Sequence, residues 1–184
     1  MSRNRRSTVV SRDARTARRS GNRSARKYAI LVLGMHRSGT SAVTRILNLL
    51  GAELPTDLMP PRDDNELGFW ESSELKSIHD KLLAHVDSSW DDPGPLPSGW
   101  LESPSVADFR EEIGSFLERS FGHARLAVIK DPRICRFVPL WIDALQECGT
   151  EPVAVLTIRN PLEVAASLKL RNQITPSHSG LASV

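Results

Sequence analysis

The sequence predicts an α/β fold in three layers, a parallel sheet with helices on both faces. Three short aliphatic runs, at residues 28–33, 125–130 and 152–158, are typical of strands buried in a parallel sheet. Segments with apolar residues at helical spacing separate and follow these runs. Because ligands bind such sheets at the carboxyl ends of the strands, we expect the functional residues directly after the three runs.

The composition of the 184 residues favours one soluble, globular domain over residues 28–184. No apolar run approaches the roughly 18 residues that cross a membrane, so no membrane partner is expected. Cys135 and Cys148 lack the spacing of a disulfide framework or a metal site, and we expect buried thiols in a reducing, cytoplasmic compartment. The five histidines also lack metal-ligand spacing, which predicts that no metal is bound.

Residues 1–27 differ sharply from the rest, because they contain ten Lys or Arg residues and a single acidic residue, Asp13. With few large apolar groups to bury, this segment is predicted to be a disordered basic tail. A transit peptide, an arm that binds nucleic acid or anionic lipid, and a simple solvated tail all remain open for it.

The first aliphatic run leads into a glycine-flanked loop, residues 34–41, with the sequence GMHRSGTS. Apolar residues at helical spacing follow the loop, and Gly51 is expected to end that helix. The glycine spacing is that of a Walker A loop, but Thr40 stands where nucleoside triphosphatases require a lysine. The backbone amides of residues 37–41 are still expected to surround an oxyanion at the start of the helix.

Two long loops, residues 52–71 and 88–103, separate the next helices. One helix should begin after Ser72 or Ser73, and another after Ser103 with Pro104 in its first position. Long loops in a compact domain often form binding segments, so these two are expected to shape a ligand site. Their aromatic residues could stack on a ligand or pack in the core: Phe69, Trp70, Trp90 and Trp100.

The second and third aliphatic runs are also followed by charged residues. Lys130, Asp131 and Arg133 lie at the end of the second run, and Arg159 follows the third. A helix ending near Cys148 should connect these two strands. The last helix is expected to bury Leu162, Val164, Ala165, Leu168 and Leu170.

Two of these motifs resemble those of sulfotransferases that use 3′-phosphoadenosine 5′-phosphosulfate. An aliphatic strand followed by GMHRSGTS is similar to the 5′-phosphosulfate loop of that family, with Arg37 at the position of a cation that is commonly lysine. The segment RNPLEVAAS, from Arg159 to Ser167, is similar to the family's 3′-phosphate motif. The motifs occur in the family's order, each at a strand-to-helix junction, and the resemblance extends from Tyr28 to about Gly180.

The resemblance implies a P-loop-like sulfotransferase fold of the bacterial type and transfer of a sulfonate group to a hydroxyl or amine. The acceptor would be a small molecule, a carbohydrate or a peptide, and neither a metal nor a nucleic acid is expected. The residues implied in nucleotide binding are His36, Arg37, Ser38, Gly39, Thr40, Ser41, Arg159 and Ser167.

For catalysis, Arg37 and Lys130 are expected to stabilise negative charge. Cytosolic relatives have a histidine at the end of the second strand, which this sequence lacks, so the general base is left open between Asp131 and Glu71. Asp131 could equally cap a helix or pair with Arg133, and Glu71 could be a first-turn helix acid. In the same way, Arg159 could merely pair with a nearby glutamate, Glu163, and the serine of that motif could be a packing residue.

Complete relatives continue with further helices, so the chain is expected to be truncated at its carboxyl terminus. The main competing hypothesis is therefore an inactive remnant that only binds the nucleotide. A kinase-like phosphotransferase, which would prefer ATP, is a weaker hypothesis, as is a nucleic-acid-binding module based on the tail.

Overall fold

The computed structural model describes residues 26–62, 65 and 67–172. The basic tail predicted for residues 1–27 lies outside them except for its last two residues, as does the chain end after residue 172. The fold is α/β with a three-stranded parallel sheet, as predicted. Its strands are β1 (Lys27–Leu33), β2 (Leu126–Lys130) and β3 (Thr150–Leu156), in the order β2-β1-β3.

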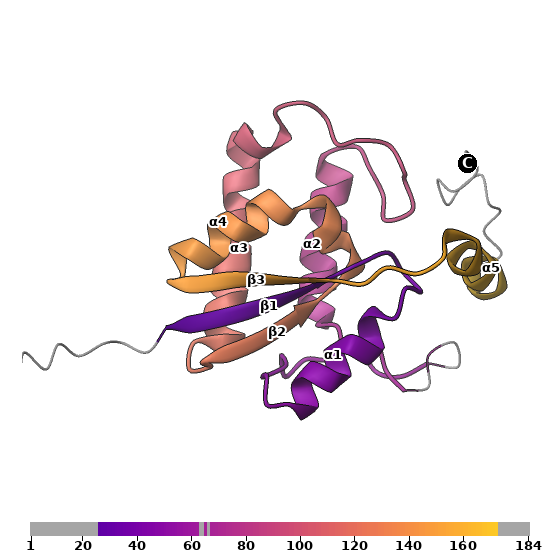
Figure 1. The fold of residues 1–184 in the computed structure, drawn as a ribbon. Helices are drawn as coiled ribbons and strands as arrows, with labels where there is room; N and C mark the ends of the chain where they lie inside the picture. Colours follow the sequence, from indigo (N-terminus) through magenta and orange to yellow (C-terminus); the bar gives the residue numbers. More distant parts are fainter. Residues whose placement is uncertain (1–25, 63–64, 66, 173–184) are drawn as a thin grey trace, which may run out of the picture.

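Helices cover both faces of this sheet (Figure 1). On one face, Leu31 and Ile129 join the main core, which is formed with α2 (Ser73–His85), α3 (Pro104–Phe121) and α4 (Val138–Glu147). On the other face, Val32 and Val128 pack against α1 (Thr40–Leu49). The chain also forms α5 (Pro161–Asn172) and two short 3-10 helices, η1 (Trp100–Glu102) and η2 (Pro132–Arg136), neither of which was predicted. None of the described helices has the length and apolar character needed to cross a membrane.

The helix starts predicted from capping residues are confirmed. Ser72 is the N-cap of α2, and its hydroxyl accepts a hydrogen bond of 2.9 Å from the Leu75 amide. Ser103 precedes α3, with Pro104 in the first turn, although the Ser103 side chain makes no capping bond. These starts are set by local backbone chemistry, which is why the sequence reveals them.

The third strand differs from its prediction in both bounds and burial. It ends at Leu156 instead of residue 158, and the side chains of Val153 and Leu156 are 42% and 65% exposed. Edge position alone does not explain this exposure, because β2 is the other edge strand of the sheet and is mostly buried; the reason is helix coverage. Among the described helices α4 packs on β3, whereas α1 covers β1 and β2. The aliphatic run at residues 152–158 therefore predicted the strand correctly but did not predict its exposure.

Three packing predictions were wrong. In α5, Val164 and Leu168 are buried but Leu162 and Leu170 are exposed, because the helix lies beyond the end of the sheet (Figure 1) and buries only one narrow stripe. Cys135, in η2, is exposed, and its sulfur accepts a 3.1 Å bond from the Gly34 amide of the glycine loop. Cys148, at the end of α4, is only partly buried.

Candidate functional site

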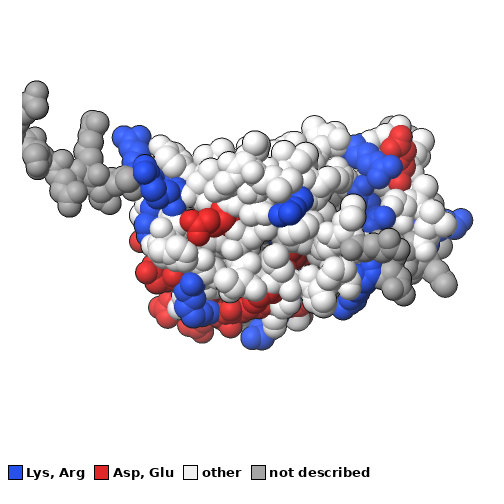
Figure 2. Space-filling view, turned by 90° about the horizontal axis from the view of Figure 1, so that it is seen from below, with Lys and Arg blue, Asp and Glu red and all other residues white. Residues whose placement is uncertain are grey.

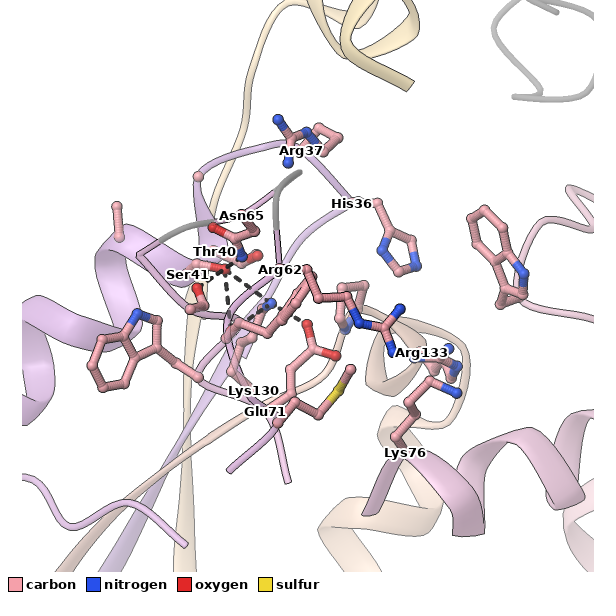
Figure 3. Close-up of a pocket in the computed structure, with 18 of the residues that line it drawn as sticks. His36, Arg37, Thr40, Ser41, Arg62, Asn65, Glu71, Lys76, Lys130 and Arg133 are labelled. Atoms are coloured by element: carbon pink, nitrogen blue, oxygen red, sulfur yellow. Dashed lines mark hydrogen bonds and ion pairs between the residues drawn. The ribbon is translucent and has the colours of Figure 1, made fainter. Parts of the chain in front are cut away.

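A cavity of about 1760 Å³ opens at the carboxyl ends of β1 and β2 (Figure 3). Its walls come from the glycine loop and the first turns of α1, the loop before α2, one side of α2 from Lys76 to Ala84, residues 88–90 and the start of η2. Among the described residues that line it, basic side chains outnumber acidic ones by seven to two. The basic ones are Arg37, Arg45, Arg62, Lys76, Lys130, Arg133 and Arg159, and the acidic ones are Glu71 and Asp80.

The glycine loop is held in shape by its glycines and its hydroxyl groups. Gly34 lies so close to Thr157 that a Cβ at this position would be 2.1 Å from the threonine hydroxyl oxygen, so only glycine fits. Gly39, the N-cap of α1, has a φ of 92°, which favours glycine. The Ser38 hydroxyl donates a 2.6 Å bond to the Met35 carbonyl. The loop therefore directs the N-terminus of α1 toward the cavity, as an anion site requires.

Lys130 joins three separate segments at the base of the cavity. Its Nζ donates to the Ser41 hydroxyl and to the Phe69 carbonyl, both at 3.2 Å, and forms an ion pair with the Glu71 carboxylate. Both charged side chains of the pair are almost fully buried, at 3% and 7% exposure. The end of β2, the glycine loop and the loop before α2 are thus fixed to one another through one ammonium group.

Glu71 has the properties of a general base. Burial raises the pKa of its carboxyl group above the ordinary value, and the neighbouring Lys130 only partly offsets that effect. A carboxylate with a raised pKa accepts a proton more readily at neutral pH. Glu71 precedes the N-cap Ser72, so it is not an acid of the first helical turn.

Asp131, the other candidate base, is occupied by structural contacts. One carboxylate oxygen accepts bonds from the Arg133 amide at 2.9 Å and its guanidinium at 3.0 Å, and the other contacts the His79 ring at 3.1 Å. Burial alone would raise the pKa of Asp131, but the His79 ring and Arg133 outweigh it and hold the pKa below the ordinary range. Asp131 caps η2 and does not line the cavity, so this geometry favours Glu71.

A buried chain of polar groups behind Asp131 was not predicted from the sequence. The Trp141 indole N–H donates to His79 Nε2 at 3.0 Å, so that nitrogen is unprotonated and the Nδ1 hydrogen points to Asp131. Asp80 was also missed, and it accepts bonds from Lys76 and Arg133 at 2.6 and 2.7 Å. Of these contacts, only the Lys76–Asp80 ion pair could have been predicted from the sequence, from its i,i+4 spacing on a helix.

The two motifs of the predicted nucleotide site meet at Arg37. The Arg37 Nε donates to the Ser167 hydroxyl at 2.8 Å, and an Arg159 nitrogen donates to the Arg37 carbonyl at 3.1 Å. Arg159 also forms an exposed ion pair with Glu163 at 2.8 Å, the local pairing that the sequence allowed for this arginine. Figure 3 shows Arg37 on the opposite side of the glycine loop from Lys130.

No protein-family model, curated protein or solved structure matches this chain. The likeness to sulfotransferases therefore depends on the residues named above and on their arrangement. Among the described residues, no group of three or more His, Cys, Asp or Glu side chains could hold a metal ion.

The other predicted residues are distributed around the same loop. His36, Gly39, Thr40 and Ser41 line the cavity, whereas Ser38 does not. Ser167 also lies outside the cavity lining. Of the aromatic residues, Phe69, Trp70 and Trp90 line the cavity, and Trp90 meets the His36 ring edge-on at 5.1 Å. Trp100 instead packs on the core against Phe137.

Charge on the outer surface differs between the two ends of the molecule. Figure 2 shows that the end nearest the amino terminus carries both acidic and basic side chains on this face, whereas the end where α5 lies carries mainly Lys and Arg. The carboxyl ends of the strands lie toward that basic end (Figure 1). An anionic ligand would be attracted toward the site.

Proposed function

We propose that this chain binds 3′-phosphoadenosine 5′-phosphosulfate and transfers its sulfonate group to a hydroxyl or amine acceptor. The observation that carries the proposal is the meeting of the glycine loop and the Arg159–Ser167 segment at Arg37, beside a cavity with a buried Lys130–Glu71 pair. An adenine nucleotide without a 3′-phosphate has no group for the Arg159–Ser167 segment to bind. A sulfotransferase donor gives a role to both.

In this proposal, the amides of residues 37–41 and the N-terminus of α1 bind the 5′-phosphosulfate. Arg159 and Ser167 bind the 3′-phosphate, which requires Arg159 to exchange its exposed partner Glu163 for the phosphate. An exposed ion pair contributes only about 0–1 kcal/mol, so this exchange costs little. A guanidinium–phosphate contact is stronger because it can be bidentate.

The transfer step then uses the buried pair. Glu71 takes the proton from the acceptor hydroxyl or amine, whose oxygen or nitrogen forms a bond to the sulfur in line with the leaving group. The bond between sulfur and the bridging oxygen breaks, and its electron pair leaves with the 5′-phosphate. Lys130 stabilises the sulfonate oxygens, and Arg37 with the loop amides stabilises the leaving phosphate.

The test is a calorimetric titration of the chain with 3′-phosphoadenosine 5′-phosphate and, separately, with 5′-AMP. We expect the bisphosphate to bind at least about tenfold more tightly, because charge-assisted contacts to the 3′-phosphate are worth about 1.5–3 kcal/mol. Equal binding of the two nucleotides contradicts the proposal, and a preference for ATP with Mg²⁺ indicates a phosphotransferase. Tight binding without release of the bisphosphate from the phosphosulfate, in a mixture of hydroxyl and amine acceptors, would indicate a protein that only binds the nucleotide.

A further inference from the structure

A second group of cations lies in the cavity on the side away from Arg37. Lys76 extends from α2, Arg133 comes from η2, and Arg62 comes from the loop before α2 (Figure 3). Figure 3 shows all three on the same side of the glycine loop as Glu71. The proposed nucleotide contacts use none of them, so this group needs another explanation.

The carboxylates of Asp80 and Asp131 hold the Arg133 guanidinium in place. Its Nε donates to Asp80 at 2.7 Å and its Nη1 donates to Asp131 at 3.0 Å, while the side chain is only 7% exposed. The remaining nitrogen, Nη2, takes part in neither of these two bonds, and Arg133 lines the cavity.

Lys76 lies beside this guanidinium, because the same Asp80 accepts its bond at 2.6 Å. Asp80 is thus shared between two cations, and Arg62 adds a third positive charge to the same wall. Glu71 is already paired with Lys130, and Arg133 is also paired with Asp131, so the three cations of the wall exceed their two carboxylates by one positive charge. Arg62 is exposed, but Arg133 is only 7% and Lys76 37% exposed, so an anion that accepts bonds from Lys76 and Arg133 is favoured there.

We infer that the acceptor carries a carboxylate, which binds Lys76 and Arg133 while the reacting hydroxyl or amine lies at Glu71. This inference depends on the proposed function for the identity of the reaction, but the anion site itself depends only on the cations of the wall. The substrate class is therefore an acidic acceptor, such as a uronic acid or a hydroxylated aromatic acid.

The test uses pairs of compounds that differ chiefly in the carboxylate. Two such pairs are 4-nitrophenyl β-D-glucuronide with the matching glucoside, and 4-hydroxybenzoate with 4-hydroxybenzyl alcohol. Each is titrated by ligand-observed NMR, with and without saturating 3′-phosphoadenosine 5′-phosphate. In at least one pair we expect the acid to bind about tenfold more tightly, the size of one charge-assisted bond.

Variants of α2 localise the effect. Lys76→Met should remove most of the preference for the acid, and Lys76→Arg should retain it, because the charge is kept. Lys81→Met is the matched control: Lys81 is on the same helix, is 61% exposed and does not line the cavity. This control should bind the acids as the unaltered protein does.

The outcomes separate the two proposals. The acidic acceptor is wrong if no acid binds more tightly than its neutral partner. It is also wrong if Lys81→Met lowers the affinity for the acid as much as Lys76→Met does. In either case the nucleotide site stands if the bisphosphate binds. If an acid is preferred with the Lys76 dependence but the bisphosphate binds no better than 5′-AMP, the anion site stands and the sulfotransferase proposal is wrong.

Discussion

The two ends of the site carry the same kind of ion pair in opposite environments. At the end of β2, Lys130 and Glu71 are 3% and 7% exposed, whereas at the end of β3, Arg159 and Glu163 are 44% and 58% exposed. A buried pair that loses one partner leaves a charge without solvent, but an exposed pair can separate at almost no cost. The β2 end is therefore fixed before any ligand binds, and the β3 end can exchange partners at little cost, as the proposed nucleotide binding requires.

The largest change in unfolding free energy is expected at the β2 end of the site. Asp131→Asn removes a buried carboxylate that pairs with Arg133 and contacts His79. Since arginine cannot lose its proton, we expect a loss of about 3–5 kcal/mol of unfolding free energy, as for other broken buried pairs. Urea unfolding followed by tryptophan fluorescence measures it. A loss below about 1 kcal/mol, the range of exposed pairs, would remove the contrast between the two ends.

A smaller effect is expected at Lys130. In Lys130→Met the buried Glu71 loses its cation but can take up a proton, so we expect a loss of about 1–3 kcal/mol. The double variant with Glu71→Gln should recover part of this loss, because it removes the unpaired carboxylate. If the two changes add without any coupling, the ion pair does not stabilise the fold.

The pH dependence of stability follows from the raised pKa of Glu71. A carboxyl group whose folded-state pKa is raised stabilises the fold while it is protonated, and this contribution is lost as the pH rises through the folded value. Relative to Glu71→Gln, the unaltered protein should therefore lose unfolding free energy as the pH rises above the ordinary glutamate value of about 4.3. A constant difference between the two proteins over that range would show that the pKa is not raised.

The smallest effect is expected at the exposed end. Glu163→Gln should change the unfolding free energy by less than about 0.5 kcal/mol, because its pair with Arg159 is exposed. It should also leave the affinity for 3′-phosphoadenosine 5′-phosphate unchanged or increase it, since Arg159 is then released for the phosphate. A large loss of stability would mean that the β3 end is as rigid as the β2 end.

The same contrast separates what the sequence could predict from what it could not. The glycine loop and the start of α2 at Ser72 depend on neighbouring residues, and both were recognised from local patterns. The contacts of Lys130 with Glu71 and of His79 with Trp141 join residues about sixty positions apart, and no local pattern encodes them. The exposure of β3 had no local signal either, because similar aliphatic runs form the buried strand β2 and the exposed strand β3.

Arg37 and Ser167 illustrate an intermediate case. Their motifs were recognised separately, and it was the parallel order of the sheet that brought the strand ends together. The sequence could predict that both motifs lie at the same edge of the sheet, but not that they would touch at one side chain.

The central claim, that the glycine loop and the Arg159–Ser167 segment form one nucleotide site, is tested most directly by titrating motif variants with 3′-phosphoadenosine 5′-phosphate. Arg119→Leu is the control, because Arg119 is a similarly exposed arginine that pairs with Glu74 and lies outside the cavity lining. We predict that Arg159→Leu and Ser167→Ala each weaken the bisphosphate toward the affinity of 5′-AMP, while Arg119→Leu leaves its affinity unchanged. Motif variants that bind the bisphosphate as tightly as the control would contradict the account.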